Sequence, residues 1–186
     1  TNTASGAAAG ECAAGDNFND TIAFNIPGAG VHTIHPGSPT LPSLPTVTAS
    51  VVIDGYTQPG ARTNAGSSSG TDAVLLIEIS GVNTQPGANG LMIAGTGVTA
   101  TIRGLIINGF SGRGIQVQSG SATITGNFIG TNPAGTAAGP GNGQNGIEIA
   151  GLGLIGGAAL ADRNLISGNG GDGIRATFPG LQIRGN

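Results

Sequence analysis

The stretch TIRGLIINGF at residues 101–110 contains the pattern that predicts the fold. Its opening phrase, an isoleucine followed by one residue and a glycine, returns in TITGNFIG at residues 123–130. It returns once more in LQIRGN at residues 181–186. A phrase that recurs at intervals of this size is typical of solenoids and other repeat architectures. The sequence therefore predicts a fold in which one short unit repeats along the chain.

Three phrases follow one another in constant order. The first is Ile-x-Gly, the second is an apolar pair that runs into a small polar residue, and the third is a glycine followed by alternating apolar residues. The first phrase occupies residues 51–55, 101–104, 123–126, 154–157 and 181–185. The second occupies residues 77–81, 105–109, 127–131 and 164–168, and the third residues 90–93, 114–117, 146–149 and 173–176. A looser earlier pass lies at residues 20–36.

The length of each run indicates strands. Each is four to six residues long and is flanked by Gly, Pro or Asn, which punctuate strands and turns. Equivalent positions are 22 to 32 residues apart, as from Ile102 to Ile124 and from Ile115 to Ile147. A helical repeat would need longer runs with a 3.6-residue period, and a β-sandwich does not keep a fixed three-strand order. We predict an all-β, three-faced parallel solenoid of about five coils, stacked about 4.8 Å apart.

The phrases also predict a register. The isoleucine of each first phrase is expected to face the interior in one aliphatic stack made of Ile53, Ile102, Ile124, Ile155 and Ile183. The next residue points outward, so Asp54 is expected beneath Arg103, and Glu148 beneath Arg175. Ser80, Asn108 and Ser167 are expected at equivalent corners. They either bond to one another in a polar ladder along the stack or are ordinary surface turn residues.

Composition excludes several functions. The chain has 186 residues, enough for one domain, and its 37 glycines follow no Gly-X-Y period. All six basic residues are arginine and the net charge is −3, so neither a nucleic-acid patch nor a polybasic membrane signal is predicted. No apolar run is long enough for membrane insertion, and no signal-peptide pattern is present. Cys12, the one cysteine, reads as an inert thiol or as half of an intermolecular bridge.

Several phrases carry a resemblance to a known family, among them DTIAFNIPGAG (20–30), IRGLIINGFSGRGI (102–115) and RNLISGNGGDGI (163–174). The chain resembles the pectate-lyase-like superfamily, and within it the modules of large secreted or surface-attached bacterial proteins. The resemblance implies a right-handed parallel β-helix over residues 20–186. Such relatives often begin with Cys-Ser/Thr-Leu-Arg-Glu-Ala, of which residues 10–22 keep only the cysteine. Residues 1–19 are therefore interpreted as an extended arm or a partial cap.

The same superfamily includes polysaccharide lyases and glycosidases, so carboxylates decide whether catalysis is expected. Glycoside hydrolysis needs two carboxyl groups about 5–9.5 Å apart, and calcium-assisted lyases need several that converge on one cation. In the predicted register Asp54, Glu78 and Glu148 lie on three different faces. The strand acids therefore predict neither kind of site.

Two weaker groups of chemistry-bearing residues remain as candidates. Asp162, Arg163 and Asp172 are placed near one corner of the fourth coil, where solvated turn residues are the competing interpretation. His32 and His35 are expected to be outward residues at a strand end, and they lack a third ligand for a metal. No catalytic residue, cofactor or metal is assigned beyond these candidates.

The last phrase, at 181–185, opens a new coil and is expected to leave strand edges that invite pairing. Further coils of a longer chain, a cap made by residues 1–19, or a second copy are the three candidates to cover it. If DTIAFNI (20–26) is a second-face strand, head-to-tail copies stay in phase and propagate into a filament.

These observations predict a non-enzymatic structural or adhesive module, secreted or on the cell surface, that self-associates or continues into further coils. A polysaccharide is a candidate partner. The alternatives are a carbohydrate-active lyase or hydrolase, and a glycan-binding module without chemistry. The last has few aromatic platforms, with one Tyr, five Phe and no Trp.

Overall fold

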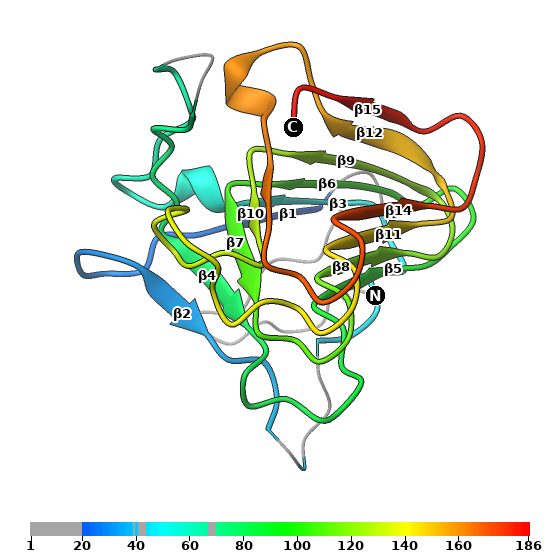
Figure 1. The fold of residues 1–186 in the computed structure, drawn as a ribbon, viewed down its shortest axis with the longest axis horizontal. Coiled ribbons are helices and arrows are strands. Elements are labelled where there is room, and N and C mark those ends of the chain that lie inside the picture. Colours follow the sequence, from blue (N-terminus) through cyan, green and yellow to red (C-terminus); the bar gives the residue numbers. More distant parts are fainter. Residues whose placement is uncertain (1–19, 39, 41–43, 67–69) are drawn as a thin grey trace, which may run out of the picture.

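Short runs of alternating apolar residues form three separate parallel sheets, and successive coils of the chain add strands to each (Figure 1). The computed structural model describes residues 20–38, 40, 44–66 and 70–186. Cys12 and the expected arm or cap at 1–19 lie outside them. All strand pairs within the sheets are parallel, which makes the fold an all-β, three-faced parallel β-helix, as predicted.

The three phrases correspond to the three sheets. The first sheet contains, in order, β1 (Asp20–Ala23), β3 (Val51–Asp54), β6 (Thr99–Arg103), β9 (Ser121–Thr125), β12 (Leu152–Gly156) and β15 (Gln182–Arg184). The second contains β2 (His32–Ile34), β4 (Ile77–Ser80), β7 (Leu105–Asn108), β10 (Phe128–Ile129) and β13 (Leu165–Ile166). The third contains β5 (Leu91–Ile93), β8 (Ile115–Val117), β11 (Ile147–Ile149) and β14 (Ile174–Ala176). Two 3-10 helices, η1 (Gly55–Thr57) and η2 (Leu160–Asp162), lie in turns after first-sheet strands.

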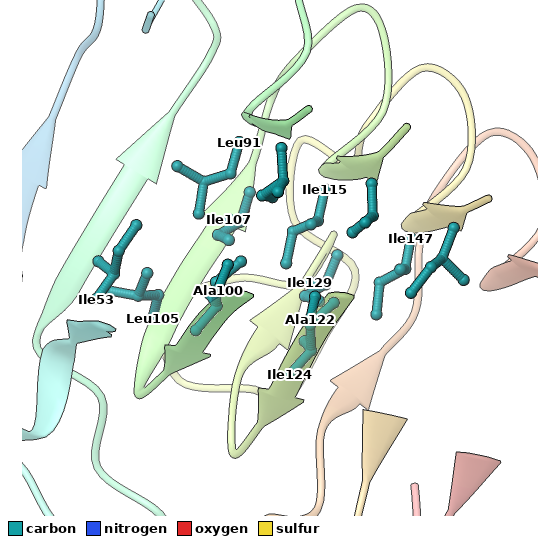
Figure 2. Close-up of a cluster of buried hydrophobic side chains, with 14 of the residues drawn as sticks. Ile53, Leu91, Ala100, Leu105, Ile107, Ile115, Ala122, Ile124, Ile129 and Ile147 are labelled. Atoms are coloured by element: carbon teal, nitrogen blue, oxygen red, sulfur yellow. The ribbon is translucent and has the colours of Figure 1, made fainter. Parts of the chain in front are cut away.

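The aliphatic stack exists in the predicted register. Its members, each paired with the next, are Ile22, Ile53, Ile102, Ile124, Ile155 and Ile183. The central members are fully buried, whereas Ile22 and Ile183 on the outer strands are 48% and 50% exposed. Figure 2 shows side chains from all three sheets meeting in this core. Because burial of one such side chain is worth roughly 1.5–3 kcal/mol, stacking of neighbouring coils stabilises the fold.

Glycine marks the corner after every described first-sheet strand except β1. Gly104 has φ +71°, and a Cβ placed on it would lie 2.8 Å from the backbone nitrogen of Tyr56. An L-residue with a side chain would therefore be strained there and would clash with the adjacent coil. This explains why the first phrase ends in glycine.

A second apolar cluster covers part of the outer side of the second sheet. Leu75, Ile106 and Phe128 are buried there, with Tyr56, Ala73 and Leu165 partly buried around them. The outward positions Ile106 in β7 and Phe128 in β10 are thus apolar, whereas those of β6 and β9 in the first sheet carry serine, threonine and Arg103.

Two predictions about the first coil are wrong. The strand in DTIAFNI is β1, which belongs to the first sheet and pairs with β3, because its Ile22 aligns with Ile53. His32 does not face outward: it lies in register with the buried Ile77, on the inward side of β2. The first sheet therefore has six strands against five in the second, so β15 stacked on β1 of a copy would leave the second sheet a strand short. Head-to-tail copies joined through β15 and β1 would therefore be out of phase.

Candidate functional site

Three of the strand carboxylates stand on three different sheets, as the register predicted, and a fourth, Asp20, opens β1 in the first sheet. Asp54 ends β3 in the first sheet, Glu78 lies in β4 of the second and Glu148 in β11 of the third. Their surroundings decide whether any of them is available for chemistry.

Both carboxylate oxygens of Asp54 contact neighbouring residues. Its Oδ2 lies 2.6 Å from Nη2 of Arg103, the partner predicted from the register, and its Oδ1 accepts the backbone N–H of Tyr56 at 3.0 Å. The Tyr56 hydroxyl in turn donates to the carbonyl oxygen of Gly126 at 2.8 Å. Burial, helped by the charge of Asp54 and opposed by Arg103, raises the pKa of Tyr56 to about 12. A hydroxyl that stays protonated and points at a backbone carbonyl joins coils and is not a general base.

Glu148 is held by an arginine from the preceding coil. It is in register with Arg175 as predicted, but its ion pair is with Arg113, whose Nε lies 2.8 Å from Oε2 of Glu148. Asn145 Nδ2 donates to Oε2 at 2.8 Å, and Gln116 Nε2 lies 3.4 Å from Oε1. Arg113 above all, with help from Asn145 and Gln116 and against the effect of burial, lowers the pKa of Glu148. A carboxyl group with a lowered pKa is a poor proton donor at neutral pH.

Glu78 also has both oxygens occupied. The Thr33 hydroxyl donates to Oε2 at 2.6 Å, and Asn108 Nδ2 donates to Oε1 at 2.8 Å. Asn108 is the register partner of Ser80, which confirms the predicted alignment of that corner. Its amide donates to Glu78 and to the Thr131 carbonyl oxygen, however, and not along a ladder.

The candidate group from the sequence is spread over two turns. Asp162 ends η2, before β13, and its Oδ2 accepts the backbone N–H of Ala159 at 3.1 Å, as a helix cap does. Arg163 is the next residue, and its N–H donates to the Leu160 carbonyl oxygen. Asp172 lies after β13 and is exposed, and its backbone N–H donates to Asn145 Oδ1 at 2.9 Å. The three residues flank β13 on either side and do not share one corner.

Among the described residues, neither histidine belongs to a group that could hold a metal ion. His35 is exposed, with Nδ1 3.4 Å from the Ser80 carbonyl oxygen, and His32 is turned inward. Within the described ranges no three His, Cys, Asp or Glu residues are grouped so as to hold a metal ion.

Two asparagine ladders, which were not predicted from the sequence, connect the coils. In the first, Asn127, Asn164 and Asn186 stack at the corner between the first and second sheets. Asn127 Nδ2 donates to Asn164 Oδ1 at 3.1 Å, and Asn164 Nδ2 to Asn186 Oδ1 at 2.8 Å. Asn142 and Asn169 form the second ladder, between the second and third sheets, where Asn142 Nδ2 donates to Asn169 Oδ1 at 2.9 Å. Each asparagine also donates to backbone carbonyls, so the ladders satisfy polar groups that the turns bury.

A cleft of about 410 Å³ opens at the corner between the third and first sheets. Hydroxyl and apolar side chains line it, among them Thr96, Thr99, Ser119, Ser121, Leu152 and Phe178. Leu152 and Phe178 are 52% and 49% exposed. No charged residue occurs among the described residues that line the cleft.

Comparison of the chain with protein-family models, with curated proteins and with solved structures finds no significant match. In the part of the chain that the structure describes, no helix has the length and apolarity needed to cross a membrane.

Proposed function

We propose that this chain is a non-enzymatic β-helix module of the pectate-lyase-like superfamily that serves as a structural and adhesive part of a secreted or surface protein. One observation carries the proposal: three of the strand carboxylates each bind a side chain of a neighbouring coil. Asp54 holds Arg103, Glu78 holds Asn108 and Glu148 holds Arg113. Hydrolysis of a glycoside needs one carboxyl group as acid and a second within about 9.5 Å as nucleophile or base. Asp54, Glu78 and Glu148 stand on three sheets and do not supply such a pair. Asp20 shares a sheet with Asp54 but lies three residues out of register with it.

Two carboxylates in turns also have structural partners. Asp162 caps η2, and Asp72 accepts the backbone N–H groups of Ala65 and Gly66 at 2.8 and 3.0 Å. The N–H of Ala65, followed by that of Gly66, lowers the pKa of Asp72. Carboxylates placed in this way order loops, which suits a scaffold.

The outer strands suggest what the module joins. Ile22 in β1 and Ile183 in β15 are half exposed, and both strands belong to the first sheet. A β-helix partner that begins with a second-sheet strand would keep the rotation of the three sheets after β15. Further coils of this kind fit that surface better than β1 of a second copy, because β1 would again be a first-sheet strand. The secreted or surface location rests on the resemblance of the repeated phrases.

Turnover assays test the proposal. The purified chain is incubated with pectin, alginate and neutral polysaccharides, and new reducing ends and unsaturated products are measured against a known lyase. We expect no product above the blank. Product formation that is lost in Glu148→Gln, or in the pair Asp162→Asn and Asp172→Asn, would establish the carbohydrate-active alternative instead.

A further inference from the structure

We propose that the cleft between the third and first sheets binds an uncharged glycan, with Phe178 as the stacking platform and Ser and Thr hydroxyls as hydrogen-bond partners. The inference rests on the adhesive role proposed above and gives it a site and a ligand class. Phe178 lies in the turn between β14 and β15 and Thr99 at the start of β6, so the lining comes from several coils.

The floor of the cleft is a regular row. Thr99, Ser121 and Leu152 are register partners on β6, β9 and β12, three consecutive strands of the first sheet. Their inward neighbours Ala100 and Ala122 are buried, so the row faces outward. Strands of one sheet lie about 4.8 Å apart. A chain lying along the solenoid axis would therefore meet two hydroxyls and then an apolar surface, one position per coil.

The hydroxyls retain hydrogen-bonding capacity. Ser119 Oγ accepts the backbone N–H of Gly95 at 2.8 Å, and Thr99 Oγ1 lies 3.1 Å from Ser50 Oγ. A hydroxyl provides one donor and two acceptor lone pairs, so one bond does not exhaust it. Such groups can both donate to and accept from sugar hydroxyls.

The apolar side of the cleft suits the C–H face of a sugar ring. Phe178 and Leu152 are each about half exposed, although large apolar side chains on a soluble protein are more often covered. Concave sites with mainly apolar walls and a few placed polar groups are the usual form of small-ligand sites, and 410 Å³ falls in their ordinary size range.

The absence of charge among the described lining residues selects the ligand. A uronate polymer carries one carboxylate per sugar, and this cleft offers it no arginine. An anion placed there would lose hydration without gaining a partner. A neutral glycan has hydroxyls for Thr99 and Ser121 and no charge to desolvate.

Calorimetric titration tests the inference, with cellohexaose, xylohexaose and mannohexaose as neutral probes and a galacturonate hexamer as the anionic one. We expect at least one neutral probe to bind and the galacturonate hexamer not to bind. Phe178→Ala is expected to weaken binding about tenfold and Ser121→Ala about threefold. Val82→Ala, which removes an equally exposed apolar side chain outside the cleft, is the matched control and leaves binding unchanged.

The outcomes separate this inference from the proposed function. No binding of any neutral probe, or binding that Phe178→Ala and Ser121→Ala both leave intact, overturns the cleft assignment while the turnover assays still support a structural module. Concentration-dependent association in light scattering that Phe178→Ala abolishes makes the cleft a contact between copies, and also overturns it. Cleavage of a bound probe refutes the non-enzymatic function. Circular dichroism of each variant confirms that it is folded.

Discussion

Asn127→Ala tests whether the first asparagine ladder stabilises the fold. Asn127 is fully buried, and its Oδ1 accepts the backbone N–H of Leu105 at 3.0 Å. Its Nδ2 lies within 2.9–3.1 Å of the Ile102 and Thr125 carbonyl oxygens and of Asn164 Oδ1. Alanine removes all four contacts, and it takes from the buried Leu105 N–H the acceptor that Asn127 provides.

The expected loss follows from these contacts. A buried polar group left without its partner costs about 1–3 kcal/mol. The Leu105 N–H and one carbonyl oxygen together give a loss of about 3 kcal/mol in the free energy of unfolding. For a chain of this length, that corresponds to a fall of roughly 6–12 °C in the melting temperature. Domains are stable by only about 5–15 kcal/mol, so the change is large enough to measure.

Urea unfolding followed by far-ultraviolet circular dichroism provides the measurement. Asn83→Ala is the matched control, because Asn83 is exposed and lies outside both ladders, and its effect should stay within about 0.5 kcal/mol. Asn127→Asp keeps the acceptor for Leu105 but turns a carboxylate toward two carbonyl oxygens, so it should destabilise at least as much as alanine. If Asn127→Ala loses less than about 1 kcal/mol, the ladder does not carry the stability assigned to it here.

Two further predictions concern the core and the tyrosine. Ile124→Ala, in the fully buried middle of the stack, should lower the free energy of unfolding by about 2–5 kcal/mol, whereas Ile183→Ala, at a position 50% exposed, should lower it by about 1 kcal/mol or less. Equal losses in urea unfolding would contradict the stacking model. Tyr56 is the only tyrosine in the chain, so tyrosinate absorbance reports on it alone. Because folding raises its pKa to about 12, the folded state should keep this stabilisation below about pH 10 and lose it as the pH rises toward 12. A native titration midpoint near pH 10, as in urea, would show that the hydroxyl is not buried as described.

Most of the fold was predictable because periodicity reports directly on burial. Ile102 and Ile124 occur in the same phrase, and the structure pairs them; Asp54 and Arg103, one residue later in each phrase, form the expected ion pair. The first coil was harder to predict, since β1 lacks the glycine that marks the other first-sheet corners. Without that marker, nothing in the sequence places Ile22 on one face rather than another.

The polar contacts were less predictable because they depend on turn geometry. Arg113 lies in a turn before β8, and only the path of that turn brings it to Glu148 in place of Arg175. The ladders did leave a signal in the sequence: Asn127 and Asn164 each come directly before a second-sheet strand. Asparagine in turns is so common that the signal is weak until the coils are superimposed.

The constant register from Ile102 to Ile124 has a consequence for how such a chain changes in length. Each coil is bounded by residues in equivalent register, so removing one whole turn leaves its former neighbours facing compatible partners. Deleting a single strand of a turn instead shifts every later strand onto the wrong sheet. Evolution and protein engineering alike can therefore lengthen or shorten this molecule in whole turns, and a loop that carries a new function can be inserted at a corner without moving the rest.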